Sequence, residues 1–245
     1  MIETSAALPQ ISVVVPVHDE AGAAVPLARE IAQAFAGRVF EMIFVDDASR
    51  DATRAELQAA MKDLPQLRLL AHTVNAGQSR AIRSGVLAAR GAIIVTLDGD
   101  GQNPPADAPR LVDALLAAPD SVAMVGGVRA KRQDSPSKRR ASVWANRIRR
   151  HLLGDDAADT GCGLKAFRRE AFIRLPYFDH IHRYLPALMI REGYENRYLD
   201  VEHRHRETGR SKYTNWGRLK ASLSDLMGVM WLKSRARQPG RVQEL

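Results

Sequence analysis

The chain has 245 residues, 45% of them hydrophobic and 26% charged, which suits one sizeable core and one domain. A single cysteine, Cys162, excludes an intramolecular disulfide, and no window holds the roughly 20 apolar residues that span a bilayer. The first ten residues, MIETSAALPQ, lack the pattern of a signal peptide. We therefore expect a cytoplasmic protein that is stabilised by packing.

The formal net charge of +8 favours an anionic partner such as nucleic acid, a phosphorylated ligand or a membrane surface. Much of the excess lies between Arg129 and Arg150, where Asp134 is the sole acid. On composition alone, a solvated helix face explains this run as well as a binding surface does. The low aromatic content of 6%, without a base-stacking or helix-turn-helix pattern, counts against nucleic acid.

Apolar runs alternate with helical patterns through the first hundred residues. The runs cover 11–17, 40–47, 67–73 and 92–98, and the helical patterns cover 27–37, 52–64 and 79–91. This alternation predicts an α/β fold with a mostly parallel sheet flanked by helices. A further strand is expected at 121–129, and an amphipathic helix at 181–194. In open sheets of this kind, ligands bind beyond the carboxyl ends of the strands.

Polar and small residues follow all four runs. They are Pro16, His18, Asp19 and Glu20 after the first, Asp46, Asp47 and Ser49 after the second, Asn75 and Gly77 after the third, and Asp98, Asp100 and Gln102 after the fourth. Turn and helix-cap chemistry explains any one of these ends, with Asp47, Ser49, Asn75 or Gly77 as the cap. Four such ends together indicate a ligand site.

The stretch TLDGDGQNPP, residues 96–105, carries the most informative pair. Asp98 and Asp100 are two positions apart, so an extended chain presents both carboxylates to one side. Mg²⁺ and Mn²⁺ prefer oxygen ligands and commonly combine one or two carboxylates with substrate phosphates. Gln102 can add an amide oxygen, and the two glycines let a ligand approach the backbone. The stretch therefore predicts a divalent metal held by Asp98, Asp100 and Gln102.

Four segments, VPVHDE, VDDAS, NAGQSRAIRSG and LDGDGQNPP, stand in this order on the predicted strand ends. Together they resemble the family-2 nucleotide-sugar glycosyltransferases, and within these the polyprenol-phosphate sugar synthases that include dolichyl-phosphate mannosyltransferase. The resemblance runs from about Ile11 to Tyr213. It implies a GT-A type sheet and an inverting, metal-dependent sugar transfer.

The resemblance also implies roles for the strand-end residues. The implied nucleotide-sugar site comprises Pro16, Val17, Glu20, Asp47, Asn75, Gly77 and Asp98. The metal triad, usually D-A-D-L-Q, matches Asp98, Asp100 and Gln102, so Mg²⁺ or Mn²⁺ is implied and Asp100 is counted as catalytic. His18, Asp19 and the glycines beside Asp100 depart from the pattern, which leaves the donor sugar and its base, GDP or UDP, open.

The second half supplies the implied phosphate and acceptor contacts. A G-x-R at 127–129 and the basic segment after it match Arg129, Arg139 and Ser142. The segment DTGCGLKAFRRE matches at Asp159 and Lys165, and RETGRSKY matches at Arg206, Ser211 and Lys212. Asp159 is a candidate base or sugar ligand, and Arg129 a candidate for stabilising the leaving group. Cys162 is expected to pack rather than to act as a nucleophile, and His182 is expected to be interfacial rather than a metal ligand.

The resemblance thus predicts transfer of a hexose from a nucleotide-diphospho-sugar to polyprenyl phosphate. A polyprenyl phosphate is already dianionic near neutral pH, because the second pKa of a phosphomonoester is about 6, so it needs no strong base. One alternative is transfer to a sugar hydroxyl of a glycan or lipid. Another is a basic membrane-binding or nucleic-acid-binding module with an inactive nucleotide fold.

The chain ends in an apolar-faced helical pattern with a basic end. We expect a GT-A catalytic domain at 1–215 and a C-terminal amphipathic helix with a basic tail at 216–245. This tail is an interfacial anchor, a docking helix for an integral membrane partner, or part of the core. The first two interpretations predict a peripheral protein on an anionic membrane surface, at the inner face of the cell membrane.

Overall fold

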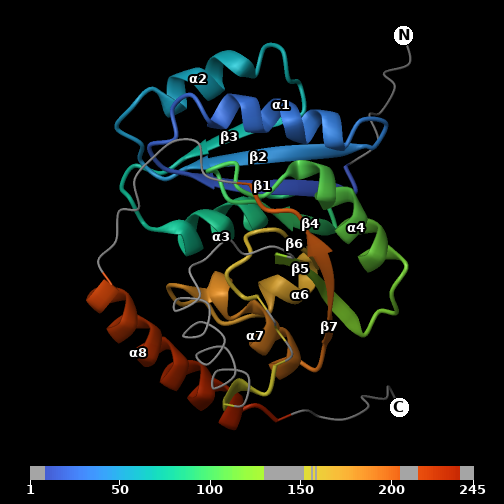
Figure 1. Ribbon diagram of the computed structural model, residues 1–245, viewed down its shortest axis with the longest axis vertical. Helices are drawn as coiled ribbons and strands as arrows, with labels where there is room; N and C mark the ends of the chain where they lie inside the picture. The colour runs from blue at the N-terminus through green and yellow to red at the C-terminus, as the bar shows by residue number, and fades with distance from the viewer. Residues whose placement is uncertain (1–8, 130–151, 156, 158, 205–214, 238–245) are drawn as a thin grey trace, which may run out of the picture.

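The fold alternates strands and helices before turning to a more irregular second half (Figure 1). The computed structural model describes residues 9–129, 152–155, 157, 159–204 and 215–237. The strands are β1 (Ile11–Val17), β2 (Phe40–Asp46), β3 (Leu67–Ala71), β4 (Ile93–Thr96), β5 (Val122–Arg129), β6 (Lys165–Arg168) and β7 (Glu195–Val201). The helices are α1 (Ala24–Ala34), α2 (Thr53–Ala60), α3 (Gln78–Ala88), α4 (Ala108–Leu116), α6 (Arg169–Ile173), α7 (Leu185–Arg191) and α8 (Asn215–Ser234), with 3₁₀ turns η1 (Pro105–Asp107) and η2 (Ile181–Arg183).

The described strands form one seven-stranded sheet in the order β3-β2-β1-β4-β6-β5-β7. Strands β1 to β4 are mutually parallel, and β5 is parallel to β7. Strand β6 is antiparallel to both neighbours, β4 and β5. The prediction of a mostly parallel sheet flanked by helices is confirmed, and the carboxyl ends of β1 to β4 lie at one edge.

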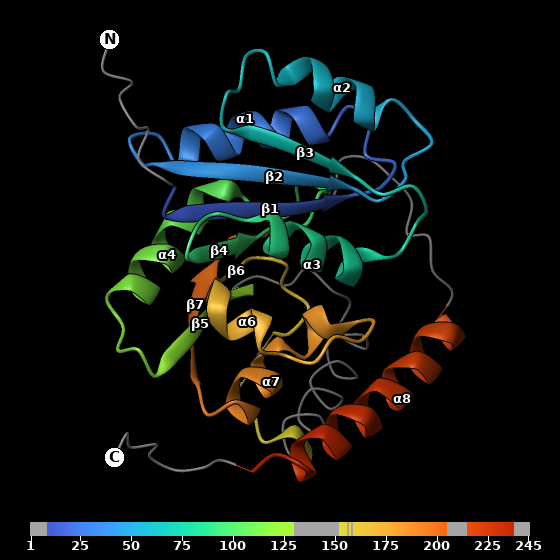
Figure 2. The same ribbon diagram turned by 180° about the vertical axis from the view of Figure 1, so that it is seen from behind.

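Helices cover both faces of the sheet (Figures 1 and 2). Helices α1, α2 and α4 pack on one face through side chains such as Ile31, Leu57 and Leu111, all fully buried. Helices α3, α6 and α7 pack on the other face, with Ile82, Phe172 and others. Burying one such side chain stabilises the fold by about 1.5–3 kcal/mol.

The amphipathic helix expected at 181–194 is shorter in the structure. Residues Ile181–Arg183 form η2, and α7 runs from Leu185 to Arg191 with Pro186 in its first turn. A proline lacks the backbone N–H and fits the first turn of a helix best, so it sets the start of α7. His180, just before η2, has a φ of 62°, which turns the chain sharply.

Helix α8 lies along the outside of the molecule, beyond α7 (Figure 1). Val229, on the inner side of α8, is buried in the hydrophobic cluster that α3, α6 and α7 form with the sheet. Its outer side exposes Leu223, Met227, Met230 and Trp231, with Met227 and Trp231 each 59% exposed. Among the described helices, none is both long enough and apolar enough for a membrane crossing.

Candidate active site

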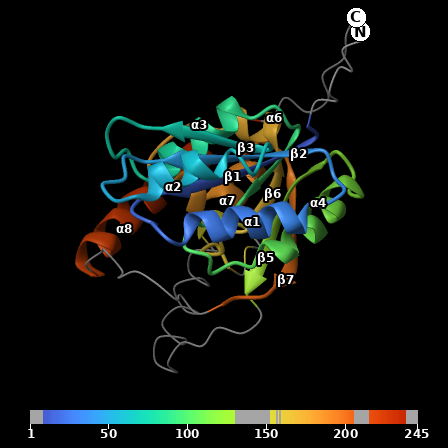
Figure 3. The same cartoon turned by 90° about the horizontal axis from the view of Figure 1, so that it is seen from above.

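The carboxyl ends of β1, β2 and β3 enclose an open cavity of about 940 Å³. Its lining comes from the segments that follow these strands. Figure 3 shows β1, β2 and β3 from above, together with the helices that cover them. The lining residues of the cavity are His18, Asp19, Ala48, Ser49, Arg50, Arg54, His72, Thr73, Val74 and Asn75. A mixed set of imidazole, amide and guanidinium groups of this kind suits a polar, hydrogen-bonding ligand.

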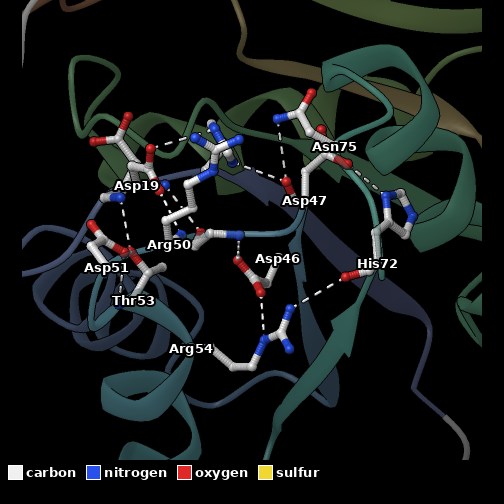
Figure 4. A network of polar contacts seen from close by, with 12 residues as sticks. Asp19, Asp46, Asp47, Arg50, Asp51, Thr53, Arg54, His72 and Asn75 are labelled. Carbon is white, nitrogen blue, oxygen red and sulfur yellow. Dashed lines mark hydrogen bonds and ion pairs between the residues drawn. The ribbon is translucent and has the colours of Figure 1, made fainter.

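Asp47 organises this edge (Figure 4). The residue follows β2 directly, is 3% exposed, and donates its backbone N–H to Val17 O at 2.9 Å. Its carboxylate accepts the backbone N–H groups of Ala76 (2.9 Å) and Gly77 (2.7 Å) and lies 2.7 Å from His72 Nδ1. Gly77 has a φ of 86°, which favours glycine. The structure therefore brings Val17, Asp47 and Gly77 together, as the sequence predicted.

Helix capping explains Gly77, which is the N-cap of α3 as one alternative expected, but it does not explain Asp47, Ser49 or Asn75. The N-caps of α2 and α3 are Ala52 and Gly77, and neither makes a side-chain cap. Asn75 instead donates its side-chain amide to Asp47 O at 3.3 Å. The alternative that Asp47, Ser49 or Asn75 serves as a cap is wrong.

Neighbouring groups complete a dense network (Figure 4). Asp46 is fully buried and accepts hydrogen bonds from Arg54 Nε at 2.6 Å and from the backbone of Ser49 at 3.1 Å. Glu20 is held at its backbone, which donates to Thr53 Oγ1 at 2.8 Å. Pro16 lies inside β1 and is buried. These contacts fix the loops before any ligand arrives.

Asp98 and Asp100 follow β4 at the centre of the same edge. Asp98 Oδ1 accepts a hydrogen bond from Gln78 Nε2 at 2.8 Å, and Asp100 Oδ1 accepts one from the backbone of Gln102 at 3.2 Å. Burial raises the pKa of Asp98, and the nearby Asp100 carboxylate raises it further. The pair thus concentrates negative charge at a partly buried position.

Two glycines surround this pair closely. A Cβ at Gly163 would lie 2.2 Å from Asp98 Oδ2, and a Cβ at Gly99 would lie 2.7 Å from Pro16 O. No larger residue fits either position without moving a carboxylate or the backbone. The glycine at 99, unusual against the D-A-D-L-Q pattern, therefore has a steric reason here.

The donor set fits a hard divalent cation. Two carboxylates separated by one residue, with an amide nearby, match the oxygen ligands that Mg²⁺ and Mn²⁺ prefer, and a cation would offset the repulsion that raises the pKa of Asp98. Across the described residues, no group of three or more His, Cys, Asp or Glu side chains is placed to hold a metal. A cation at Asp98 and Asp100 would therefore need oxygens from water or phosphate, which is usual for Mg²⁺.

Arg129 and Asp159 form a bidentate ion pair. Arg129 Nε lies 2.6 Å from Asp159 Oδ2, and Arg129 Nη2 lies 2.9 Å from Asp159 Oδ1. The hydrogen bond and charge of Asp159 raise the pKa of Arg129, and Asp159 is 6% exposed. The structure joins these two candidate catalytic residues, and in this state the carboxylate of Asp159 faces a guanidinium.

A second cavity, of about 510 Å³, opens beside Asp98. Its lining residues are Gln78, Ile82, Thr96, Leu97, Asp98, Arg129, Thr160, Gly161, Cys162, Gly163, Lys165, His182, Arg183 and Leu185. Lys165 is 5% exposed and donates its ammonium to Cys162 O. Burial lowers the pKa of Lys165, against an opposite effect from Asp98. Cys162 is buried as expected, and burial raises the pKa of its thiol.

Several predicted phosphate-binding residues cannot be placed. Arg139, Ser142, Arg206, Ser211 and Lys212 lie outside the described residues. Their roles stay predictions.

Sequence reasoning missed part of the site. Gln78 orients Asp98, His72 contacts Asp47, and His182 and Arg183 line the second cavity. His72 and Gln78 lie beside predicted strand ends, so their position in the sequence could have identified them as site residues. His182 and Arg183 come from a distant segment, and no local pattern places them beside Asp98.

Comparison with known proteins decides the family. The sequence model described as Glycosyl transferase family 2 matches residues 12–175. A relative from Pectobacterium carotovorum, named undecaprenyl-phosphate 4-deoxy-4-formamido-L-arabinose transferase, is 36% identical over 208 residues and 83% of this chain. The chain belongs to glycosyl transferase family 2. The expected resemblance to polyprenol-phosphate sugar transferases is confirmed.

Other family 2 relatives extend this picture. A protein of the same name from Pseudomonas aeruginosa is 35% identical over 223 residues, or 90% of this chain. The matches span 62% of the Pectobacterium protein and 65% of the Pseudomonas protein, so this chain corresponds to less than two thirds of each.

Solved structures share the fold. Glucosyl-3-phosphoglycerate synthase from Mycobacterium tuberculosis superposes with a TM-score of 0.67 at 20% identity, covering 95% of this chain and 82% of that one. A mannosyltransferase from Pyrobaculum calidifontis, solved with GDP-Man and Mn²⁺, superposes with a TM-score of 0.64 at 20% identity, covering 96% of this chain and 66% of that one. The GT-A fold expected for a family 2 chain is therefore confirmed.

Proposed function

We propose that this chain is an inverting glycosyltransferase that moves a hexose from a nucleotide-diphospho-sugar to polyprenyl phosphate. One observation carries the proposal: Asp98 and Asp100 stand at the carboxyl edge of the sheet, and Asp98 lines the cavity that also holds Arg129, Lys165 and Arg183. The names of the curated relatives support an undecaprenyl-phosphate acceptor.

The donor nucleotide would occupy the cavity at the ends of β1 to β3. Asp47 holds the loop of Asn75 and Gly77 in place there, and His18 and Asp19 line the wall. Asp98, Asp100 and Gln102 would hold Mg²⁺ or Mn²⁺ beside the diphosphate. When bound, the metal supplies positive charge that stabilises the leaving nucleoside diphosphate.

In the reaction, an oxygen of the acceptor phosphate attacks the anomeric carbon from the face opposite the leaving group. The bond from that carbon to the diphosphate breaks, and the nucleoside diphosphate departs with the electron pair. No proton must be removed, because the acceptor is already dianionic near neutral pH. This agrees with an Asp159 that is paired with Arg129 and so positions this cation for phosphate oxygens.

We also infer that the protein docks on an anionic membrane surface through α8. The helix exposes Leu223, Met227, Met230 and Trp231 on its outer side, and the exposed Arg235 and Arg237 follow it. Apolar residues beside cations suit the headgroup region, where each cation contributes about 1 kcal/mol.

Product analysis tests the transfer. Purified protein with Mn²⁺, a short-chain polyprenyl phosphate and a panel of UDP-sugars and GDP-sugars should form a sugar-phospholipid with inverted anomeric configuration. Faster turnover with glycans than with lipid phosphate would favour a hydroxyl acceptor. No nucleoside diphosphate released with any donor would overturn the proposal.

Vesicle sedimentation tests the docking. The double variant Met227→Ser, Trp231→Ser should bind anionic vesicles at least tenfold more weakly than the parent. Leu116→Ser is the matched control, since Leu116 is 53% exposed on α4 and should not contact lipid. Equal binding by the two variants would refute docking through α8.

A further inference from the structure

Two side chains that are far apart in sequence meet at the wall of the second cavity. Ser79 is fully buried in the first turn of α3, and His182 lies in η2. Ser79 Oγ lies 2.7 Å from His182 Nδ1. His182 also lines the cavity beside Asp98, so one edge of its ring is held by α3 while the ring borders the substrate space.

This contact occupies Nδ1 of His182 and leaves Nε2 as the ring nitrogen that can serve a ligand. Burial lowers the pKa of His182 to about 3, and the positive charges of Arg183 and Lys165 add to the effect. The ring is therefore neutral at working pH and carries one N–H. When the hydroxyl of Ser79 donates to Nδ1, the single proton of the neutral ring resides on Nε2, and Nε2–H is then a donor for a ligand.

The same wall carries unbalanced positive charge. Lys165 is 5% exposed and its ammonium contacts the backbone oxygen of Cys162 rather than a carboxylate. Arg183 forms no ion pair within the ranges that the structure describes. Arg129 is already matched by Asp159, which leaves Asp98 as the carboxylate of the cavity lining. Lys165 is buried and Arg183 is partly buried, and neither forms an ion pair among the described residues, which favours an anionic ligand at this wall.

We propose that His182, positioned by Ser79, joins Lys165 and Arg183 in a site for the oxygens of a phosphoryl group. The inference rests on the proposed function and deepens it, since it adds His182 and Arg183 to a phosphate site in which Lys165 is already expected. Nε2–H of His182 donates to one oxygen, while Lys165 and Arg183 balance the charge. The phosphoryl group belongs to the acceptor lipid or to the donor diphosphate, and binding measurements distinguish the two.

Calorimetry with two probes tests the site. Geranyl phosphate represents the acceptor, and nucleoside diphosphate with Mn²⁺ represents the donor. His182→Leu should weaken binding of one probe by roughly tenfold to a hundredfold, which is the range for a hydrogen bond to a charged oxygen. His182→Gln should restore much of the affinity, because its amide N–H can stand near the place of Nε2. Ser79→Ala should give an intermediate loss, since it frees the tautomer without removing the ring.

Arg183→Gln keeps the test valid if the His182 variants fail to fold, because Arg183 is only partly buried. Its matched control is Arg174→Gln, because Arg174, directly after α6, pairs with Glu170 and its loss should leave both affinities unchanged. A loss for geranyl phosphate alone assigns the site to the acceptor, and a loss for the nucleotide alone assigns it to the donor. Unchanged affinity for both probes in folded Arg183→Gln and His182→Leu protein would overturn the inference. Binding is measured without turnover, so it remains informative if the wild type transfers no sugar.

Discussion

The carboxyl edge of the sheet carries two acidic groups that differ in what balances their charge. Asp46 and Asp47 are buried and are satisfied by the protein itself, through Arg54, His72 and backbone N–H groups. Asp98 receives one side-chain hydrogen bond, from Gln78, but burial and the nearby Asp100 carboxylate raise its pKa. We call Asp46 and Asp47 the finished group, because groups of the protein balance them before a ligand binds. Asp98 and Asp100 are the incomplete group, whose negative charge a bound ligand would balance.

This difference separates stability from function. Removing a partner from the finished group should cost folding energy, because a buried polar atom loses its hydrogen bond. Altering the incomplete group should cost activity and leave the fold intact or more stable, since charges that await a ligand destabilise the free protein. Four substitutions can break or sharpen this contrast.

The largest effect is expected at Gly163, beside Asp98. A Cβ in Gly163→Ala would lie 2.2 Å from Asp98 Oδ2 and must displace the carboxylate. We expect sugar transfer to fall at least a hundredfold, about 2.7 kcal/mol, and thermal stabilisation by Mn²⁺ with nucleotide to disappear. Gly228→Ala, on α8 with nothing within 4 Å of the new Cβ, should leave both unchanged. Normal metal-dependent stabilisation of Gly163→Ala would place the cation elsewhere.

Asp47→Asn should remove hydrogen bonds from the finished group and so destabilise the fold. An amide cannot accept from Ala76, Gly77 and His72 together, because its NH₂ faces donors. Urea unfolding should show a loss of about 2–3 kcal/mol in the free energy of unfolding. A loss below about 0.5 kcal/mol would mean that the loop does not depend on this carboxylate.

The pH dependence of stability should report His182. The pKa of this residue is about 3 in the folded protein, against about 6.5 in the unfolded chain, so the unfolded chain binds the extra proton between these values. Stability therefore falls as pH drops below about 6.5, and the loss from this group reaches about 2 kcal/mol at pH 5. His182→Gln should remove that part of the slope in urea titrations at pH 7 and pH 5. If the free energy of unfolding changes equally for variant and parent between pH 7 and pH 5, protonation of His182 does not destabilise the fold.

The smallest change in stability is expected at Lys165. Burial lowers the pKa of its ammonium, so the charge costs free energy in the empty site. Lys165→Met should raise the free energy of unfolding by up to about 1 kcal/mol while sugar transfer falls. Destabilisation by more than about 1 kcal/mol would indicate that the lysine belongs to the finished group instead.

The fold was largely predictable because its first half repeats a simple pattern. Apolar runs at 11–17 and 40–47 become β1 and β2, and Asp47, the last residue of the second run, directly follows β2. Strand β6 was not predicted, since it has only four residues between a loop and α6 and is placed antiparallel between β4 and β5 by tertiary pairing. Short strands of this kind have no local period to detect.

The site was predictable only where strand ends supply it. The chain order places Val17, Asp47, Gly77 and Asp98 at one edge, and the structure agrees. The contact between Ser79 and His182 spans 103 positions in the sequence, so spacing cannot reveal it. The D-x-D pair likewise gave no sign that the space for a side chain at position 163 is taken by the carboxylate of Asp98.

One hydrogen bond connects the turn before η2, near the second cavity, with helix α8, the proposed membrane-docking helix. His180, whose φ of 62° sets the start of η2, has Nδ1 2.8 Å from Asp225 Oδ2 on α8. Two residues later stands His182, at the wall of the cavity. If α8 rests on the bilayer as proposed, this hydrogen bond ties the helix to the segment that lines the cavity and so holds the cavity at a constant distance from the headgroups. The depth of the reaction centre is then set by the protein, whatever the length of the lipid chain below it.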